Sequence, residues 1–176
     1  MNRVFSYGLG TCLAAGFALG GLPALSQTLA QNNVVIFGPN RDATLSYILP
    51  NRRPGVRGSR YRFFAPLPSD RAVAELQILY PAPFVGVFNP ERITVLDRRT
   101  QKPYTVERAI ADPSIGSLRL VFAEPIPAAP NRDLELAIAD VSNPRQTGMY
   151  PIEVRALGTE ANPLFQYLGQ WLVSIY

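Results

Sequence analysis

The 176-residue sequence contains no histidine and only one cysteine, Cys12. The lack of histidine excludes a serine–histidine–aspartate triad, a cysteine–histidine dyad and the usual histidine-ligated catalytic zinc. Lysine is almost absent too, since Lys102 is the single lysine in a sequence with sixteen arginines. No window sustains helical periodicity for long without a proline, and the 17 prolines and 13 glycines follow no period. These absences exclude long helices and a collagen repeat, and the sequence predicts no cofactor and no metal site.

The N-terminus has the three parts of a secretory signal peptide. A basic residue precedes the run Val4–Leu22, which has no charged side chain, and small residues follow it. Ala24 and Ser26 have the spacing that signal peptidase requires, so we expect removal of residues 1–26, with cleavage after residue 30 as the second choice. An uncleaved membrane anchor is the alternative, because the apolar run approaches the length that crosses a bilayer.

Cleavage would remove Cys12 and leave an exported chain without cysteine. Such a chain forms no disulfide, so its stability must come from its own hydrophobic core, which about 150 residues can supply. We expect a periplasmic or cell-surface protein with no transmembrane segment after cleavage. With Arg3 lost, sixteen basic and thirteen acidic side chains give a net charge of +3, which is too mild to predict nucleic acid as a partner.

From residue 34 onward, short runs of alternating apolar and polar residues are separated by proline, glycine, asparagine and aspartate. The clearest runs are Ala72–Tyr80, Ser117–Phe122, Asp133–Ala139, Tyr150–Ala156 and Gln166–Tyr176. Period-two alternation is typical of antiparallel strands with one buried and one solvated face. We predict one all-β domain over residues 34–176, an antiparallel immunoglobulin-like β-sandwich of seven to nine strands preceded by the signal-peptide helix. A jelly roll is the alternative.

Two details of this pattern lead to local predictions. The tetrapeptide Pro-Asn-Arg-Asp occurs at Pro39–Asp42 and at Pro130–Asp133, each time before a predicted strand. Proline fixes φ, and asparagine and aspartate bond to the local backbone, so both copies predict turns. In the run Ala72–Tyr80, the alternation assigns Glu75 and Gln77 to the solvent face.

The second half of the chain carries a recognisable order of motifs. They are Arg119–Pro127, a strand that runs into Pro-x-Pro; Val141–Pro144 after a strand; Gly148-x-Tyr150 at the start of a strand; and Tyr167–Gly169 before the last one. In order and spacing they resemble a cyanobacterial family of exported domains of unknown function, number twenty-eight-oh-eight. The resemblance implies export with a signal peptide and a single β-rich domain. It brings no assigned catalytic residue.

The segment Asn51–Phe64, NRRPGVRGSRYRFF, is the strongest local anomaly. Its five arginines are Arg52, Arg53, Arg57, Arg60 and Arg62. Proline and two glycines break any helix there, so we expect an exposed loop that leads into an edge strand. Arginine forks suit phosphate, sulfate and carboxylate groups, so these five residues are the candidates for binding an anion or a partner. The alternative is a solvated loop whose arginines pair with the domain's own carboxylates and protect a sheet edge.

These observations favour a non-catalytic exported domain of the cell envelope that binds an anionic glycan, an anionic lipid or an envelope protein. A carboxylate-based hydrolase is one alternative, although the acidic residues are spread singly. A carrier of an apolar small molecule between the sheets is another. Asp112, Ser114, Asp140 and Asn143 could offer oxygen atoms to calcium, but they lack EF-hand spacing and are typical of turns. No catalytic residue is predicted.

Overall fold

The computed structural model describes residues 43–84 and 87–176. The predicted signal peptide, Cys12, the start of the predicted domain and the turn Pro39–Asp42 lie outside these residues. Within them, the chain forms ten strands and two short 3₁₀ turns, Ala82–Phe84 and Pro90–Arg92. The all-β prediction is therefore confirmed. No helix in this described part has the length and apolarity that crossing a membrane requires.

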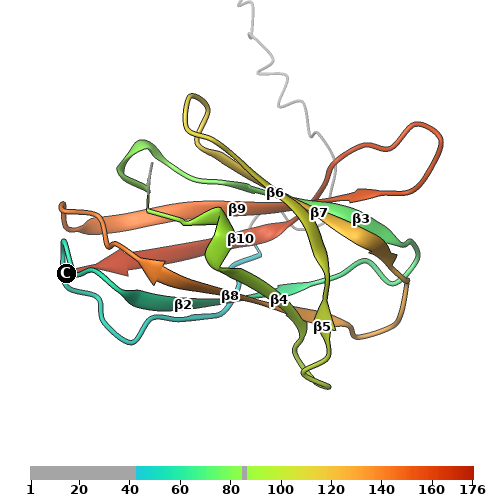
Figure 1. Cartoon of the computed structure of the whole chain (residues 1–176), viewed down its shortest axis with the longest axis horizontal. Helices are drawn as coiled ribbons and strands as arrows, with labels where there is room; N and C mark the ends of the chain where they lie inside the picture. The colour runs from blue at the N-terminus through green and yellow to red at the C-terminus, as the bar shows by residue number, and fades with distance from the viewer. Residues whose placement is uncertain (1–42, 85–86) are drawn as a thin grey trace, which may run out of the picture. The chain divides into compact units, whose positions relative to one another are not determined.

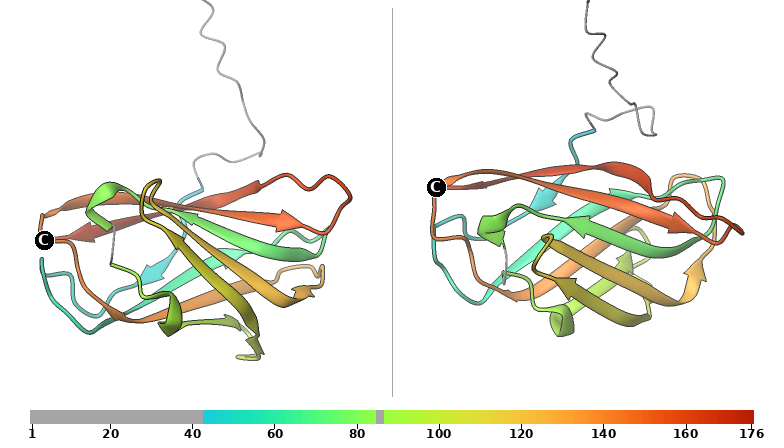
Figure 2. Two further views of the ribbon diagram at one scale, coloured as in Figure 1. Left: turned by 45° about the horizontal axis from the view of Figure 1, so that its top comes forward. Right: turned by 90° about the horizontal axis from the view of Figure 1, so that it is seen from above.

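The strands form two antiparallel five-stranded sheets (Figure 1). The first sheet has the order β1 (Tyr47–Ile48), β2 (Ser59–Pro66), β8 (Asp133–Val141), β4 (Ile93–Asp97), β5 (Pro103–Tyr104). The second has the order β10 (Gln166–Ile175), β9 (Gly148–Gly158), β3 (Val73–Leu79), β7 (Ser117–Ile126), β6 (Val106–Asp112). The sheets lie face to face in the turned views of Figure 2, which is the predicted immunoglobulin-like sandwich.

Two very short strands account for the difference between ten strands and the predicted seven to nine. Both β1 and β5 have two residues, which is too short for an alternating pattern to appear in the sequence. The chain also changes sheets at Thr105, since Tyr104 pairs with β4 in the first sheet and Val106 pairs with β7 in the second. This crossing explains why the sequence around Tyr104 and Val106 shows no clear alternation of apolar and polar residues.

The apolar faces of the strands fill the space between the sheets. Trp171 of β10 is fully buried, and its ring centroid lies 4.6 Å from that of Phe63 in β2. Its Nε1 donates a hydrogen bond of 2.9 Å to the carbonyl oxygen of Phe64. One side chain therefore connects both sheets, through packing and through a buried hydrogen bond.

A buried carboxylate with a bidentate arginine lies on the outer face of each sheet. On the first sheet, Glu135 is 3% exposed and accepts bonds from Arg62 Nε (2.6 Å) and Nη2 (2.9 Å). On the second, Glu75 is 5% exposed and accepts bonds from Arg119 Nε (2.5 Å) and Nη2 (2.7 Å). The alternation placed Glu75 on the correct face, but the arginine of the neighbouring strand covers it, so the prediction that this side chain is solvated is wrong.

The Glu135 pair makes stability depend on pH. The hydrogen bonds from Arg62 hold the pKa of Glu135 below its usual value. A depressed pKa contributes stability above the pKa of the unfolded chain, and this contribution is lost as the pH falls through the folded value. We expect Glu135→Gln to lower Tm at pH 7 and to flatten the fall of Tm between about pH 5 and pH 3. Thermal melts followed by circular dichroism measure both effects.

Glu153→Gln is the matched control, because Glu153 pairs with Arg155 at 2.9 Å but the two side chains are 40% and 38% exposed, far more than that of Glu135. This control should change Tm little, as is usual for a surface pair. If Glu135→Gln gives the same pH profile as the wild type, the buried pair is not a source of acid sensitivity.

Candidate functional site

The five predicted arginines lie in or just after the segment Asn51–Gly58, called here the arginine loop. The loop connects the short strand β1 to β2. Gly55 and Gly58 have φ of 68° and 72°, a conformation that glycine adopts without strain. The loop does lie outside the sheets, as predicted. The strand that it enters is not an edge strand, because Tyr47 and Ile48 of β1 pair with β2 and form the edge instead.

A short ladder of backbone hydrogen bonds attaches the arginine loop to the segment after β8. Gly55 donates its N–H to the carbonyl of Pro144 (3.0 Å), and Asn143 donates its N–H to the carbonyl of Val56 (2.7 Å). At the start of the loop, the carbonyl of Arg52 accepts from the N–H of Tyr176 (2.9 Å). The loop backbone is therefore fixed at three points.

The side chain of Asn143, which is 4% exposed, completes this attachment. Its Nδ2 donates to the carbonyls of Asn51 (3.0 Å) and Arg53 (2.8 Å), and its Oδ1 accepts from the hydroxyl of Tyr61 (2.7 Å). Burial raises the pKa of Tyr61 well above its usual value, so the hydroxyl remains a donor. Asn143 is thus a structural anchor for the loop, and its amide is already engaged by protein groups rather than free to ligate calcium.

Two of the five predicted arginines are engaged within the domain. The guanidinium of Arg52 lies 5.5 Å from the ring centroid of Tyr47 and 5.8 Å from that of Tyr176. Arg62 lies in β2, beyond the loop, where it pairs with Glu135. Arg62 therefore pairs with a carboxylate of the domain, as the alternative interpretation states, whereas Arg52 contacts aromatic rings.

The other three, Arg53, Arg57 and Arg60, are exposed. None of them has a carboxylate within ion-pair distance in residues 43–84 and 87–176. Arg57 lines an open hollow of about 420 Å³ together with Arg145 and Ser142. Arg145 is exposed as well, and its position far along the chain offers no reason to group it with the loop. The structure therefore places four arginines around one end of the first sheet.

The remaining sequence candidates do not form a reactive centre in the described residues. No three acidic or cysteine side chains gather there in a way that could hold a metal. Asp112 accepts bonds from the N–H (3.0 Å) and the hydroxyl (2.5 Å) of Ser114, as a turn former does. Where the pKa of a described carboxyl group is shifted, it is lowered, as at Asp97 and Asp112. A hydrolase that uses two carboxyl groups needs one with a raised pKa, so these shifts give that alternative no support.

The interior gives no support to a carrier of apolar molecules. The largest fully buried side chains include Trp171, Tyr61, Phe63 and Phe84, and they occupy the space where such a ligand would lie. Phe63, Tyr61 and Phe88 pack edge to face, with centroids 5.7 to 6.3 Å apart. This is the usual packing of aromatic side chains in a sandwich core.

Several solved structures share features of this backbone. BslA, described as a bacterial hydrophobin, aligns with a TM-score of 0.46 at 13% identity, covering 79% of this chain and 98% of that one. The collagen-binding domain of a Staphylococcus aureus adhesin aligns with a TM-score of 0.37 at 8% identity, covering 68% and 88%. An uncharacterised Nocardia farcinica protein with an immunoglobulin-like fold aligns with a TM-score of 0.38 at 15% identity, covering 74% and 98%. At these identities the likeness concerns the fold alone.

No curated protein matches the chain. The family described as "Protein of unknown function (DUF2808)" matches residues 34–175, which include all ten strands, the arginine loop and the segment around Asn143. The family number that the order of motifs suggested is therefore correct. The chain belongs to the DUF2808 family of proteins of unknown function.

Proposed function

We propose that this chain is a non-catalytic domain, exported to the periplasm or surface of a cyanobacterial cell, that binds an anionic glycan through its arginine loop. One observation carries the proposal. Arg53 and Arg57 on the loop, which the buried side chain of Asn143 fixes, and Arg60 at the start of β2 are exposed and without an acidic partner in the described residues. Export rests on the signal-like pattern of the N-terminus.

The fixed backbone matters because binding must overcome the entropy lost when groups become ordered. A free loop would lose its backbone freedom on contact with a ligand. The arginine loop has already lost it on folding, through its bonds to Asn143, Pro144 and Tyr176. Only the arginine side chains remain to be ordered, and their planar forks match carboxylate and sulfate groups with two parallel hydrogen bonds.

The composition of the loop favours a glycan over a lipid bilayer. Stable attachment to a membrane surface usually combines basic residues with apolar side chains that enter the acyl boundary. The large apolar residue of the loop, Val56, is not exposed, and neither is Pro54. The loop therefore offers charge and hydrogen-bond donors without an apolar anchor.

Replacing the three exposed arginines tests this function. We expect Arg53→Ala/Arg57→Ala/Arg60→Ala to weaken binding to alginate, a polymer of uronic acids, by about tenfold or more, because charge-assisted hydrogen bonds are lost. Tm should change by less than about 2 °C, since the side chains are exposed. Retention on immobilised alginate and thermal melts measure the two effects.

Control variants distinguish the effect of the planar guanidinium group from the effect of positive charge alone. Arg53→Lys/Arg57→Lys/Arg60→Lys keeps the charge and should still lose part of the binding. Arg57→Ala is compared with Arg108→Ala, which removes another exposed arginine, from β6. Equal binding by the triple alanine variant and the wild type would refute the proposal. So would binding to phosphatidylglycerol vesicles, or to an envelope protein, without binding to alginate.

The role of Asn143 leads to a second prediction. Asn143→Asp keeps an acceptor for Tyr61 but removes the donor that bonds to the carbonyls of Asn51 and Arg53. We expect faster amide exchange at Gly55 and weaker alginate binding, although every arginine is still present. Asn143→Ala removes all three bonds and should destabilise the domain by about 1–3 kcal/mol.

Hydrogen exchange resolved by residue, chemical denaturation and the same alginate assay give these values. Unchanged alginate binding by Asn143→Asp, together with faster exchange at Gly55, would show that fixing the loop does not contribute to binding.

A further inference from the structure

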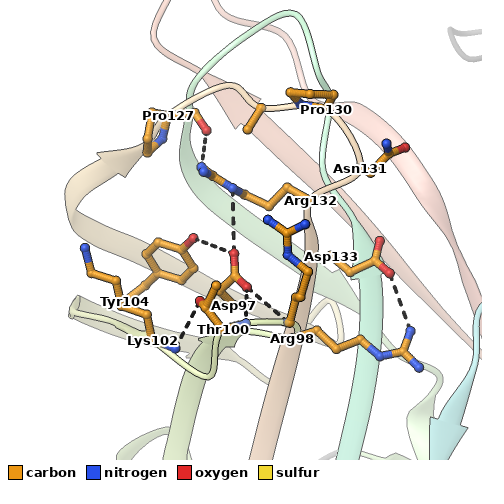
Figure 3. Close-up of a pocket in the computed structure, with 12 residues that line it drawn as sticks. Asp97, Arg98, Thr100, Lys102, Tyr104, Pro127, Pro130, Asn131, Arg132 and Asp133 are labelled. Atoms are coloured by element: carbon orange, nitrogen blue, oxygen red, sulfur yellow. Dashed lines mark hydrogen bonds and ion pairs between the residues drawn. The ribbon is translucent and has the colours of Figure 1, made fainter.

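A second cationic surface lies at the opposite end of the first sheet. It is a hollow of about 560 Å³ between the β4–β5 turn and the β7–β8 loop (Figure 3). Strand β8 begins beside this hollow at Asp133 and ends at Val141, which pairs with Ser59 next to the arginine loop. Eight steps of about 3.3 Å place the two surfaces roughly 26 Å apart. The volume is in the range of small-molecule sites.

The β4–β5 turn on one side of the hollow is rigid. Asp97 Oδ1 accepts from the backbone N–H groups of Arg99 (3.0 Å) and Thr100 (2.8 Å). Gln101 adopts a φ of 58°, and its N–H donates to the carbonyl of Asp97 (2.8 Å). The N–H of Asp97 donates in turn to the carbonyl of Lys102 (2.9 Å). The positions from which Arg99 and Lys102 project are therefore fixed.

Arg132 joins the two sides of the hollow. Its Nε lies 3.8 Å from Oδ2 of Asp97, and its Nη1 donates to the carbonyl of Pro127. Its Nη2 has no acceptor among residues 43–84 and 87–176. Figure 3 shows Arg132 lying between Pro127 and Asp97. The side chain thus holds the hollow in shape and retains one donor group for a ligand.

The hollow has an excess of positive charge. Its charged lining residues are Arg98, Arg99, Lys102, Arg132, Asp97 and Asp133, four cations against two carboxylates. The turn and Arg132 engage Asp97, and Asp133 lies 3.5 Å from Arg98. Arg99 and Lys102 are exposed and have no carboxylate within ion-pair distance in the described part of the chain. An anion would compensate this excess.

The wall beside these cations is largely non-ionic. Tyr104 is half-buried, and its hydroxyl donates a long bond of 3.4 Å to Oδ2 of Asp97. Pro127 and Pro130 line the same hollow, and Tyr104 lies below Pro127 in Figure 3. Flat aromatic and proline surfaces next to cations suit a ring that carries C–H groups on its faces and an anionic group at its edge.

We propose that this hollow binds an anionic sugar, with the phosphate or carboxylate of the ligand at Arg99 and Lys102 and its ring against Tyr104 and Pro127. The site is separate from the arginine loop and does not depend on the function proposed for that loop. A phosphorylated sugar and a uronic acid share the chemistry that the hollow recognises, so each serves as a probe.

The test is a titration of the ¹⁵N-labelled domain with glucose 6-phosphate and with glucuronate, followed by NMR. Inorganic phosphate and glucose are the reference ligands. We expect the amide signals of Thr100 and Tyr104 to shift, and Arg99→Ala/Lys102→Ala to raise Kd by about tenfold or more. Arg99→Glu/Lys102→Glu should abolish binding. Arg57→Ala, at the other end of the sheet, should leave Kd unchanged.

The NMR titration distinguishes binding in this hollow from binding at the arginine loop. Shifts confined to the hollow and lost in Arg99→Ala/Lys102→Ala support the proposal, whatever the outcome of the alginate assay. The proposal is overturned if neither sugar moves these signals at millimolar concentration, or if the alanine variant binds as well as the wild type. It is also overturned if inorganic phosphate binds as tightly as glucose 6-phosphate, since the wall then contributes nothing.

Discussion

The amide of Asn143 is the contact through which the interior of this sandwich holds its most cationic segment in place. Its oxygen accepts from Tyr61, whose ring packs edge-on against Phe63 at 5.7 Å in the core. Its nitrogen donates to two carbonyls of the arginine loop. Because a buried amide left unpaired is costly, core packing and loop geometry are coupled. A segment rich in like charges, which alone would favour an extended and variable backbone, is held in one conformation.

The arginines of the domain include some that pair with buried carboxylates and others that have no acidic partner in the described residues. Arg62 and Arg119 cover buried carboxylates on the outer faces of the two sheets, each with a bidentate contact. Arg53 and Arg57 extend from a fixed backbone without an acidic partner in the described residues. Acidic residues are fewer than basic ones, thirteen against seventeen, so one-to-one pairing leaves four basic residues without a carboxylate. In the arginine loop, backbone hydrogen bonds and the amide of Asn143, and not ion pairs, define the structure.

The alternation of the sequence predicted the sandwich, because side chains on a strand point to opposite faces with a period of two. It could not predict which faces a neighbouring strand would cover, so Glu75 was expected in water and is buried beneath Arg119. The loop arginines were predicted as a group because they are adjacent in sequence. The contribution of Arg145 was missed, since its approach to Arg57 depends on the segment after β8 pairing with the loop. The hollow lined by Lys102 and Arg132 was missed for the same reason, since it combines two connections that are remote in sequence.

The pairing of β2 with β8 along nearly their whole length has a mechanical consequence. A hydrogen-bonded strand in the middle of a sheet resists stretching and bending far more than a loop or a linker does. Two ligands held at opposite ends of β8 would therefore be kept at a set separation, and the domain would act as a rigid spacer between them. A force that pulls those ligands apart would act along β8, so many of the hydrogen bonds between β2 and β8 would have to break at the same time.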